Sequence, residues 1–134
     1  MNCIFCEIAA GKAPVEIIYE DENVLSFLDI KPLNIGHTLV IPKRHYENYL
    51  DLPADELRNI TLISQKIAAK IVKAFEPDGF NIIVNSGKAA GQSIFHFHYH
   101  IIPRYSDDKV KFNIVFKSYG NGEMKQIAEK IKNV

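Results

Sequence analysis

Three of the five histidines in the chain occur at alternate positions, as His96, His98 and His100. Alternate side chains project from the same face of a β-strand, so a strand here would display a row of imidazoles. A strand rises about 3.3 Å per residue, which separates neighbouring imidazoles by roughly 6.6 Å and the outer pair by about 13 Å. One metal ion with nitrogen ligands at about 2.1 Å would reach two neighbours but not all three. The row therefore suits more than one task.

A neutral imidazole is a good nucleophile at pH 7. At phosphorus it forms a phosphoramidate that water later cleaves, which splits one difficult displacement into two easier steps. The segment 85–93 precedes the row and contains two glycines, whose backbone N–H groups suit a phosphate. These residue types together indicate phosphate chemistry. The alternative is a polar strand face in solvent.

The cysteines Cys3 and Cys6 form the second feature that could do chemistry. A lone Cys-x-x-Cys is compatible with a redox pair, half of a metal site or two buried apolar residues. Zinc would need two more ligands, and imidazoles from His45 and His96 are the candidates for a Cys₂His₂ tetrahedron. The alternative is a reduced, metal-free pair, with His45 capping a loop.

Five short segments rich in β-branched and aromatic residues, each bounded by turn formers, predict five strands at 16–19, 24–28, 37–41, 80–84 and 95–102. Apolar residues at three- and four-residue intervals predict a long helix at 54–75, and a shorter one is expected at 122–132. A further short helix is expected after Cys6. Short connections favour antiparallel neighbours. We therefore expect an α+β fold, with a mostly antiparallel five-stranded sheet packed against the long helix.

The charge balance is zero, because 16 Lys and Arg face 16 Asp and Glu among 134 residues. Such a chain has no overall field to attract a nucleic acid polymer or an anionic membrane. No apolar run approaches the ~20 residues that span a bilayer, and the N-terminus lacks a secretory signal pattern. We therefore expect one domain, residues 1–134, in the cytoplasm. The alternating apolar residues of segment 105–118 suit a strand or a partner-facing arm.

The stretch 96–102, His-Phe-His-Tyr-His-Ile-Ile, matches at every position the His-φ-His-φ-His-φ-φ signature, with φ apolar, of the histidine triad (HIT) family. This family consists of nucleotide hydrolases and transferases. Blocks at 27–32 and 36–45, then Asn85 and the Gly-Gln-Ser of 91–93, resemble family blocks in family order. The resemblance covers roughly residues 3–104 and is closest to the phosphoramidase (HINT) branch and its bacterial relatives. It implies a HIT-like fold and a homodimer.

The resemblance also implies roles for individual residues. His98 would attack the α-phosphorus of a nucleotide and carry the nucleotidyl group, while His100 and His37 would contact the phosphate and support the nucleophile. Asp29 would bind the ribose hydroxyls, and Ile30 would line the pocket. Phosphate or leaving-group contacts would come from Asn85, Gln92 and Ser93, with Gly91 allowing close approach. Apolar residues such as Phe5, Ile8 and Ile30 suit a base pocket without selecting a base.

Some bacterial HIT proteins and the related galactose-1-phosphate uridylyltransferases bind zinc through such a cysteine pair and two histidines. By this resemblance, a structural zinc would be held by Cys3, Cys6, His45 and His96, and no organic cofactor is expected. The implied activity is hydrolysis of nucleoside 5′-phosphoramidates, with adenosine 5′-monophosphate (AMP) derivatives as substrates, through a nucleotidyl-His98 intermediate. Alternatives are a dinucleoside polyphosphate hydrolase and a zinc-stabilised nucleotide-binding module with little turnover.

Overall fold

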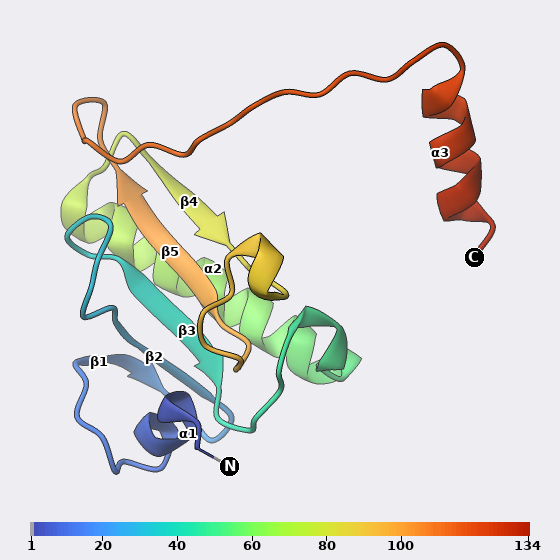
Figure 1. Cartoon of the computed structure of the whole chain (residues 1–134). Helices are drawn as coiled ribbons and strands as arrows, with labels where there is room; N and C mark the ends of the chain where they lie inside the picture. The colour runs from blue at the N-terminus through green and yellow to red at the C-terminus, as the bar shows by residue number, and fades with distance from the viewer. Residues whose placement is uncertain (1) are drawn as a thin grey trace.

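The computed structural model describes residues 2–134, in which one five-stranded sheet has helices on both faces (Figure 1). The strands are β1 (Ile17–Glu20), β2 (Val24–Leu28), β3 (Thr38–Pro42), β4 (Gly79–Ile83) and β5 (Tyr99–Arg104). The helices are α1 (Ile4–Ala9), α2 (Ala54–Phe75) and α3 (Glu123–Lys132), with 3₁₀ turns η1 (Tyr49–Asp51) and η2 (Lys88–Ala90). The strand order is β1-β2-β3-β5-β4, and every neighbouring pair is antiparallel. The predicted α+β fold is confirmed.

Helix α2 has the predicted bounds and crosses one face of the sheet (Figure 1). Asp55 and Glu56 lie in its first turn, where acidic side chains complement the helix dipole. The C-cap residue Glu76, directly after its last residue, has a left-handed conformation with φ 47°. Its apolar face is buried against the sheet. The buried aliphatic residues of this face are Ile60, Ile63, Ile67, Ala68 and Ile71.

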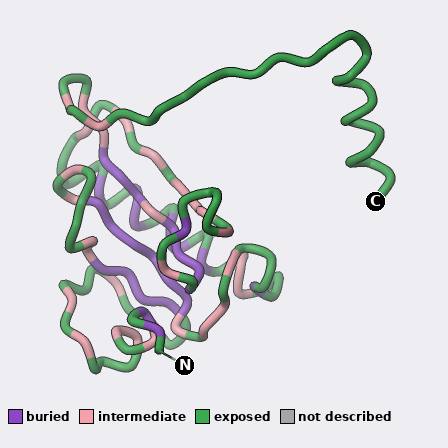
Figure 2. The backbone as a smooth tube through the Cα atoms, viewed as in Figure 1, coloured by how far each residue is buried: buried purple, intermediate pink, exposed green. Residues whose placement is uncertain are grey.

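The sheet carries a separate hydrophobic core on each face, and its central strands are buried (Figure 2). Because successive side chains alternate between faces, Val40 packs with α2 while its neighbour Leu39 packs with α1. Ile101 likewise faces α2. His100 therefore faces the α1 side, opposite Leu39 in the ladder between β3 and β5. Strand alternation thus fixes which face carries the site.

The predicted strand 95–102 is wrong at its start, because β5 begins only at Tyr99. His96 and His98 precede the strand. The Pro42 carbonyl bonds the His96 ring at 2.7 Å, and the Phe97 N–H donates to Tyr46 O at 2.7 Å. These bonds take the place of a ladder with β3. The imidazoles therefore do not form the expected row: the His98 and His100 ring centroids lie 4.7 Å apart.

The N-terminal helix also differs from the prediction. It was expected after Cys6, but α1 begins at Ile4 and contains Cys6, with Cys3 as its N-cap residue. The Glu7 N–H bonds to the Cys3 carbonyl at 3.1 Å, which starts the helix one turn early. The two cysteines therefore flank the first turn of α1.

After β5 the chain leaves the sheet as an extended arm, residues 109–134, that ends in α3 (Figure 1). Arg104 and Asp108 anchor its base through hydrogen bonds of 2.9 and 3.0 Å. Residues 111–134 are all exposed (Figure 2). The alternating apolar residues of 105–118 do not form a strand, so the arm is the alternative that remains. Within residues 2–134, no helix is both long and apolar enough to cross a membrane.

Candidate functional site

A cavity of about 570 Å³ lies between α1 and the sheet, and we call it the α1 cavity. Its volume is in the range of pockets that hold one small ligand. Most of its wall is apolar, with Ile4, Phe5 and Ile8 coming from α1. Its polar lining residues are Asp29, Lys31, Ser93, His98 and His100. An apolar wall with a few polar groups at one end suits a ligand that has one apolar and one charged part.

The imidazole of His98 is oriented by the backbone. Its Nδ1 lies 2.7 Å from the His96 carbonyl oxygen, which can only accept a hydrogen bond. Nδ1 therefore carries the proton, and Nε2 keeps its lone pair. Nε2 has no hydrogen-bond partner. Within residues 2–134 every fully buried side-chain nitrogen and oxygen has such a partner, so Nε2 is not fully buried. Because His98 lines the α1 cavity, Nε2 is accessible from it. A neutral imidazole presented in this way is a nucleophile.

The neighbouring imidazole presents the opposite group. The Leu33 N–H donates to Nδ1 of His37 at 3.1 Å, so Nε2 of His37 carries the proton and donates to Nδ1 of His100 at 3.0 Å. This leaves the Nε2–H of His100 free to donate. His100 also lines the α1 cavity. The His98 ring with its lone pair and the His100 ring with its N–H are therefore neighbours at the α1 cavity, with centroids 4.7 Å apart.

Burial keeps all three rings neutral near pH 7. It lowers the pKa of His98, although the bond to the His96 carbonyl opposes the shift. Burial, helped by the neighbouring His98 and His37, lowers the pKa of His100 to about 4. Burial also lowers the pKa of His37, against the pull of Asp29. The rings therefore act as neutral donors and acceptors.

Asp29 directly follows β2 and lies beside this pair. Its Oδ1 accepts the Lys31 N–H at 2.8 Å, and its Oδ2 lies 3.6 Å from Nε2 of His37. Asp29, His37 and His100 lie close enough to hold a cation. However, a cation on Nε2 of His37 would move the proton to Nδ1, where the Leu33 N–H points. This trio therefore suits hydrogen bonding, and Oδ2 of Asp29 remains available to accept from a ligand hydroxyl.

The loop 85–93 contributes less to the cavity wall than its sequence suggests. The Gln92 amide donates to Glu47 O at 2.7 Å and accepts from the Gly87 N–H at 2.8 Å, so it holds the loop together. Gly91 has φ 104°, and a Cβ there would meet Asn85 at an ordinary 3.7 Å. Gly91 is therefore needed for its backbone conformation. Ser93 lines the cavity.

The structure thus brings Asp29, Ile30, Ser93, His98 and His100 to the α1 cavity, with His37 bonded to His100 from outside its wall. The nucleotide contacts of Asn85, Gly91 and Gln92 stay predictions. Sequence reasoning missed several apolar lining residues. They are Ile4, Ala13, Pro14, Val15, Phe27, Leu28, Leu39 and Ile94. Strand alternation at 37–41 gave a signal for Leu39, whereas the loop 13–15 has no periodic pattern.

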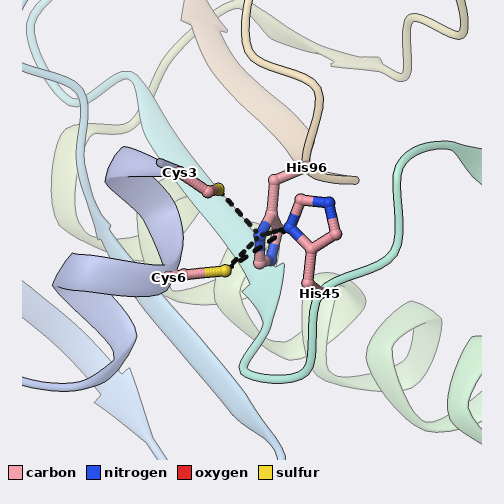
Figure 3. Close-up of side chains that lie close together, drawn as sticks. All are labelled: Cys3, Cys6, His45 and His96. Atoms are coloured by element: carbon pink, nitrogen blue, oxygen red, sulfur yellow. Dashed lines mark hydrogen bonds between the residues drawn. The ribbon is translucent and has the colours of Figure 1, made fainter. Parts of the chain in front are cut away.

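The four predicted metal ligands converge next to the cavity (Figure 3). Cys3 and Cys6 extend from the first turn of α1, His45 from the loop after β3, and His96 from the segment before β5. The Nδ1 atoms of the two histidines lie 3.2 Å apart. The Cys3 sulfur lies 3.4 Å from Nδ1 of His96, and the Cys6 sulfur lies 3.4 Å from Nδ1 of His45. Segments distant in sequence therefore present four donor atoms to one point.

These donor atoms fit a tetrahedral cation. Zinc bonds of about 2.1 Å to nitrogen and 2.3 Å to sulfur place ligand atoms about 3.4 to 3.8 Å apart, close to the observed separations. The His96 Nε2–H donates to Pro42 O, so its Nδ1 offers a lone pair. Burial and Cys3 raise the pKa of the Cys6 thiol to about 11, so a bound cation would be needed to keep it a thiolate at neutral pH. The residues therefore fit zinc.

Comparisons with relatives and solved structures identify the family. The HIT domain family matches residues 10–107. An uncharacterized HIT-like protein of Methanocaldococcus jannaschii is 46% identical over 132 residues, covering 97% of this chain and 98% of that protein. Adenylylsulfatase HINT3 of Arabidopsis thaliana is 45% identical over 107 residues, covering 80% of this chain and 54% of that protein.

Among solved structures, a HIT family member from Bacillus subtilis has a TM-score of 0.90 at 44% identity, covering 100% of this chain and 98% of that one. A Zn-bound histidine triad family protein from Mycobacterium smegmatis has a TM-score of 0.78 at 40% identity, covering 98% of this chain and 96% of that one. The chain therefore belongs to the HIT domain family, a family of nucleotide-binding hydrolases and transferases.

Proposed function

We propose that the protein hydrolyses nucleoside 5′-phosphoramidates, with adenosine 5′-monophosphoramidates as the preferred class, through a nucleotidyl-His98 intermediate. The observation that carries this proposal is the pairing of two neutral imidazoles at the α1 cavity. His98 offers a lone pair at Nε2, and His100 offers an N–H beside it. A nucleophile next to a hydrogen-bond donor for a phosphate oxygen is what displacement at phosphorus requires.

The reaction has two displacements. In the first, Nε2 of His98 bonds to the α-phosphorus and the P–N bond to the amine breaks. The amine leaves with the bonding electron pair and takes up one proton from solvent, relayed through the hydroxyl of Ser93, which lines the cavity. In the second, water bonds to the phosphorus and returns one proton to solvent. The P–N bond to His98 breaks, its electron pair returns to Nε2, and AMP is released. The His100 N–H donates to a phosphate oxygen throughout, and His37 holds His100 in that tautomer.

The shape of the α1 cavity supports a mononucleotide. Apolar side chains, among them Phe5, Ile8 and Ile30, suit one face of a base, and the free oxygen of Asp29 suits a ribose hydroxyl. A volume of about 570 Å³ suits one nucleotide better than two. The Arabidopsis relative whose name describes an adenylylsulfatase supports an adenylyl group as the part that is transferred.

The cluster of Cys3, Cys6, His45 and His96 is the site we assign to a structural zinc. The zinc-bound relative from Mycobacterium smegmatis supports this assignment. When bound, zinc would supply charge neutralisation for two thiolates and a cross-link between α1 and the segment before β5. Four protein ligands leave no open position for a reacting water, so the hydrolytic chemistry belongs to the histidines at the cavity. We expect the protein to act in the cytoplasm, where thiols stay reduced.

A homodimer is the assembly we propose, and two surfaces support it. Strand β4 lies at the sheet edge, where Phe80 and Ile82 are 46% and 44% exposed beside an apolar groove of about 500 Å³. The arm exposes further apolar residues, with Phe116 at 91%. Large apolar side chains left exposed in this way mark interaction sites.

Charge complementarity points to a second copy of the chain as the partner. Residues 109–134 contain six lysines and two glutamates, a net charge of +4. Because the whole chain has a net charge of zero, residues 1–108 carry a net charge of −4. A basic arm from one copy would therefore be attracted to the acidic body of another.

An AMP adduct tests the nucleophile. Incubating the protein with an adenosine phosphoramidate and analysing it by mass spectrometry should reveal a covalent AMP group, which His98→Ala should abolish. The matched variant His100→Ala keeps the nucleophile but removes the donor, so it should still form the adduct, slower by roughly 10²-fold. An adduct at full level in His98→Ala would disprove the assignment. Faster turnover of a diadenosine polyphosphate would favour a dinucleoside polyphosphate hydrolase. No product from either substrate would favour a nucleotide-binding module with little turnover.

Nitrogen-15 NMR tests the neutral rings. At pH 5.5 an ordinary histidine is about nine-tenths protonated, whereas His100, with a pKa of about 4, should stay neutral. The unfolded chain therefore binds this proton before the folded protein does. The free energy of unfolding should accordingly decrease as the pH falls from about 6.5 toward 4. His98 should show the Nδ1–H tautomer at pH 7, and titration of His100 near pH 6.5 would contradict the assigned geometry.

Metal analysis tests the zinc site. Protein purified without chelator should contain close to one zinc per chain, because four donors already converge at the bonding distances of a tetrahedral ion. Cys3→Ser/Cys6→Ser should lose most of the zinc, measured by inductively coupled plasma mass spectrometry. The comparison variant His37→Gln leaves the four ligands intact and should keep it. Undiminished zinc in the double serine variant, or none after reconstitution of the wild type, would exclude this site.

Sedimentation tests the dimer. The wild type should sediment at about twice the 15.2 kDa of one chain. Ile82→Glu places a carboxylate in the apolar groove and should shift the equilibrium toward the monomer by at least tenfold, since an unpaired charge resists burial. Lys12→Glu introduces the same carboxylate at an exposed position that is already polar, and should leave the dimer intact. A monomeric wild type at micromolar concentration would refute the assembly.

A further inference from the structure

Helix α1 takes part in both the metal cluster and the α1 cavity. Its N-cap Cys3 and its residue Cys6 point to His45 and His96, as Figure 3 shows. Ile4, Phe5 and Ile8 of the same helix line the cavity. The two cysteines and these three apolar residues all lie between positions 3 and 8 of the chain. A displacement of α1 would therefore alter both sites at once.

Besides the bond from the His98 ring to the His96 carbonyl, Phe5 makes a direct side-chain contact with both sites. It is only 4% exposed and lies between the two cysteines in sequence. Its ring meets the His98 ring edge-on, with centroids 5.1 Å apart and planes at 89°. It meets the His96 ring in the same manner, at 5.8 Å and 75°. One aromatic side chain thus packs against a metal ligand and against the nucleophile.

Few polar bonds hold α1 in place. A six-residue helix is marginal on its own, and α1 has no side-chain cap. Within residues 2–134, the side-chain hydrogen bonds that join residues 2–12 to the rest of the chain all run from Cys3 or Cys6 to His45 or His96. The remaining attachment is apolar packing. The position of this cavity wall therefore depends strongly on the four metal ligands.

We propose that occupancy of the Cys/His cluster by zinc and occupancy of the α1 cavity by a nucleotide are coupled through α1 and Phe5. The inference rests on the proposed function. Zinc fixes α1, and α1 then presents its cavity wall preformed to the nucleotide. Thermodynamic linkage makes the effect reciprocal. The nucleotide increases the affinity for zinc by the same factor as zinc increases the affinity for the nucleotide, and we call this the coupling factor. Phe5 and His96 are positioning residues in this scheme.

Two binding measurements test the coupling without turnover. The first titrates AMP into the full-length protein by calorimetry, in the zinc-loaded form and after zinc removal by a chelator. The second measures zinc affinity by chelator competition, with and without saturating AMP. The dissociation constant for AMP should increase at least fivefold on zinc removal, and AMP should tighten zinc binding by the same factor. Equal AMP affinity in both forms, or zinc affinity indifferent to AMP, would overturn the proposal.

The variant Phe5→Leu separates this coupling from a general loss of folding. It keeps all four metal ligands, so it should retain zinc. The ratio of the AMP dissociation constants without and with zinc should fall toward one. Phe80→Leu makes the same change on the far side of the sheet and should keep the wild-type factor. A Phe5→Leu protein with wild-type coupling would exclude the route through Phe5. Absence of any AMP binding by zinc-loaded wild type would refute the proposed function itself, and the coupling with it.

Discussion

The structure depends on backbone groups that fix the tautomers of His37, His96, His98 and His100. The His96 carbonyl accepts a hydrogen bond from the Nδ1–H of His98, and the Pro42 carbonyl accepts one from the Nε2–H of His96. The Leu33 N–H sets the tautomer of His37 and, through it, that of His100. Because the peptide groups have fixed roles as donor or acceptor, each ring can present only one kind of nitrogen to its site. Chemically identical side chains thereby become a ligand, a nucleophile and a donor.

This division of roles requires the chain to leave the sheet before His98. Had β5 begun at residue 95, the Phe97 N–H and the Pro42 carbonyl would have been used in the ladder with β3. Instead they bond to Tyr46 and to the His96 ring. The irregular segment brings His98 close to His100, with ring centroids 4.7 Å apart, and leaves the His96 carbonyl to bond the His98 ring, while β5 holds His100 itself. The loss of regular pairing is thus what lets neighbouring histidines serve two sites.

The sequence predicted the regular elements well and the irregular ones poorly. The bounds of α2 were predicted from apolar residues at three- and four-residue intervals. Strand alternation correctly placed His100 and Tyr99 on opposite faces of the sheet. The start of β5 could not be predicted, because the groups that replace its ladder, the Pro42 and Tyr46 carbonyls, are more than 50 residues away. The grouping of Cys3, Cys6, His45 and His96 was predicted from ligand chemistry together with the family resemblance. The cavity wall at 13–15 has no periodic pattern and appears only in three dimensions.

The metal cluster also sets an order on folding. Cys3 and His96 are 93 residues apart in the chain, so the cluster joins the N-terminus to the segment before the last strand. On a ribosome, α1 would emerge long before its histidine partners, and a six-residue helix does not persist alone. We therefore expect α1, although it is made before its histidine partners, to be among the last elements to reach its place. A cation bound there would close the long loop between Cys3 and His96, and it would stabilise the position of α1 after the sheet has formed.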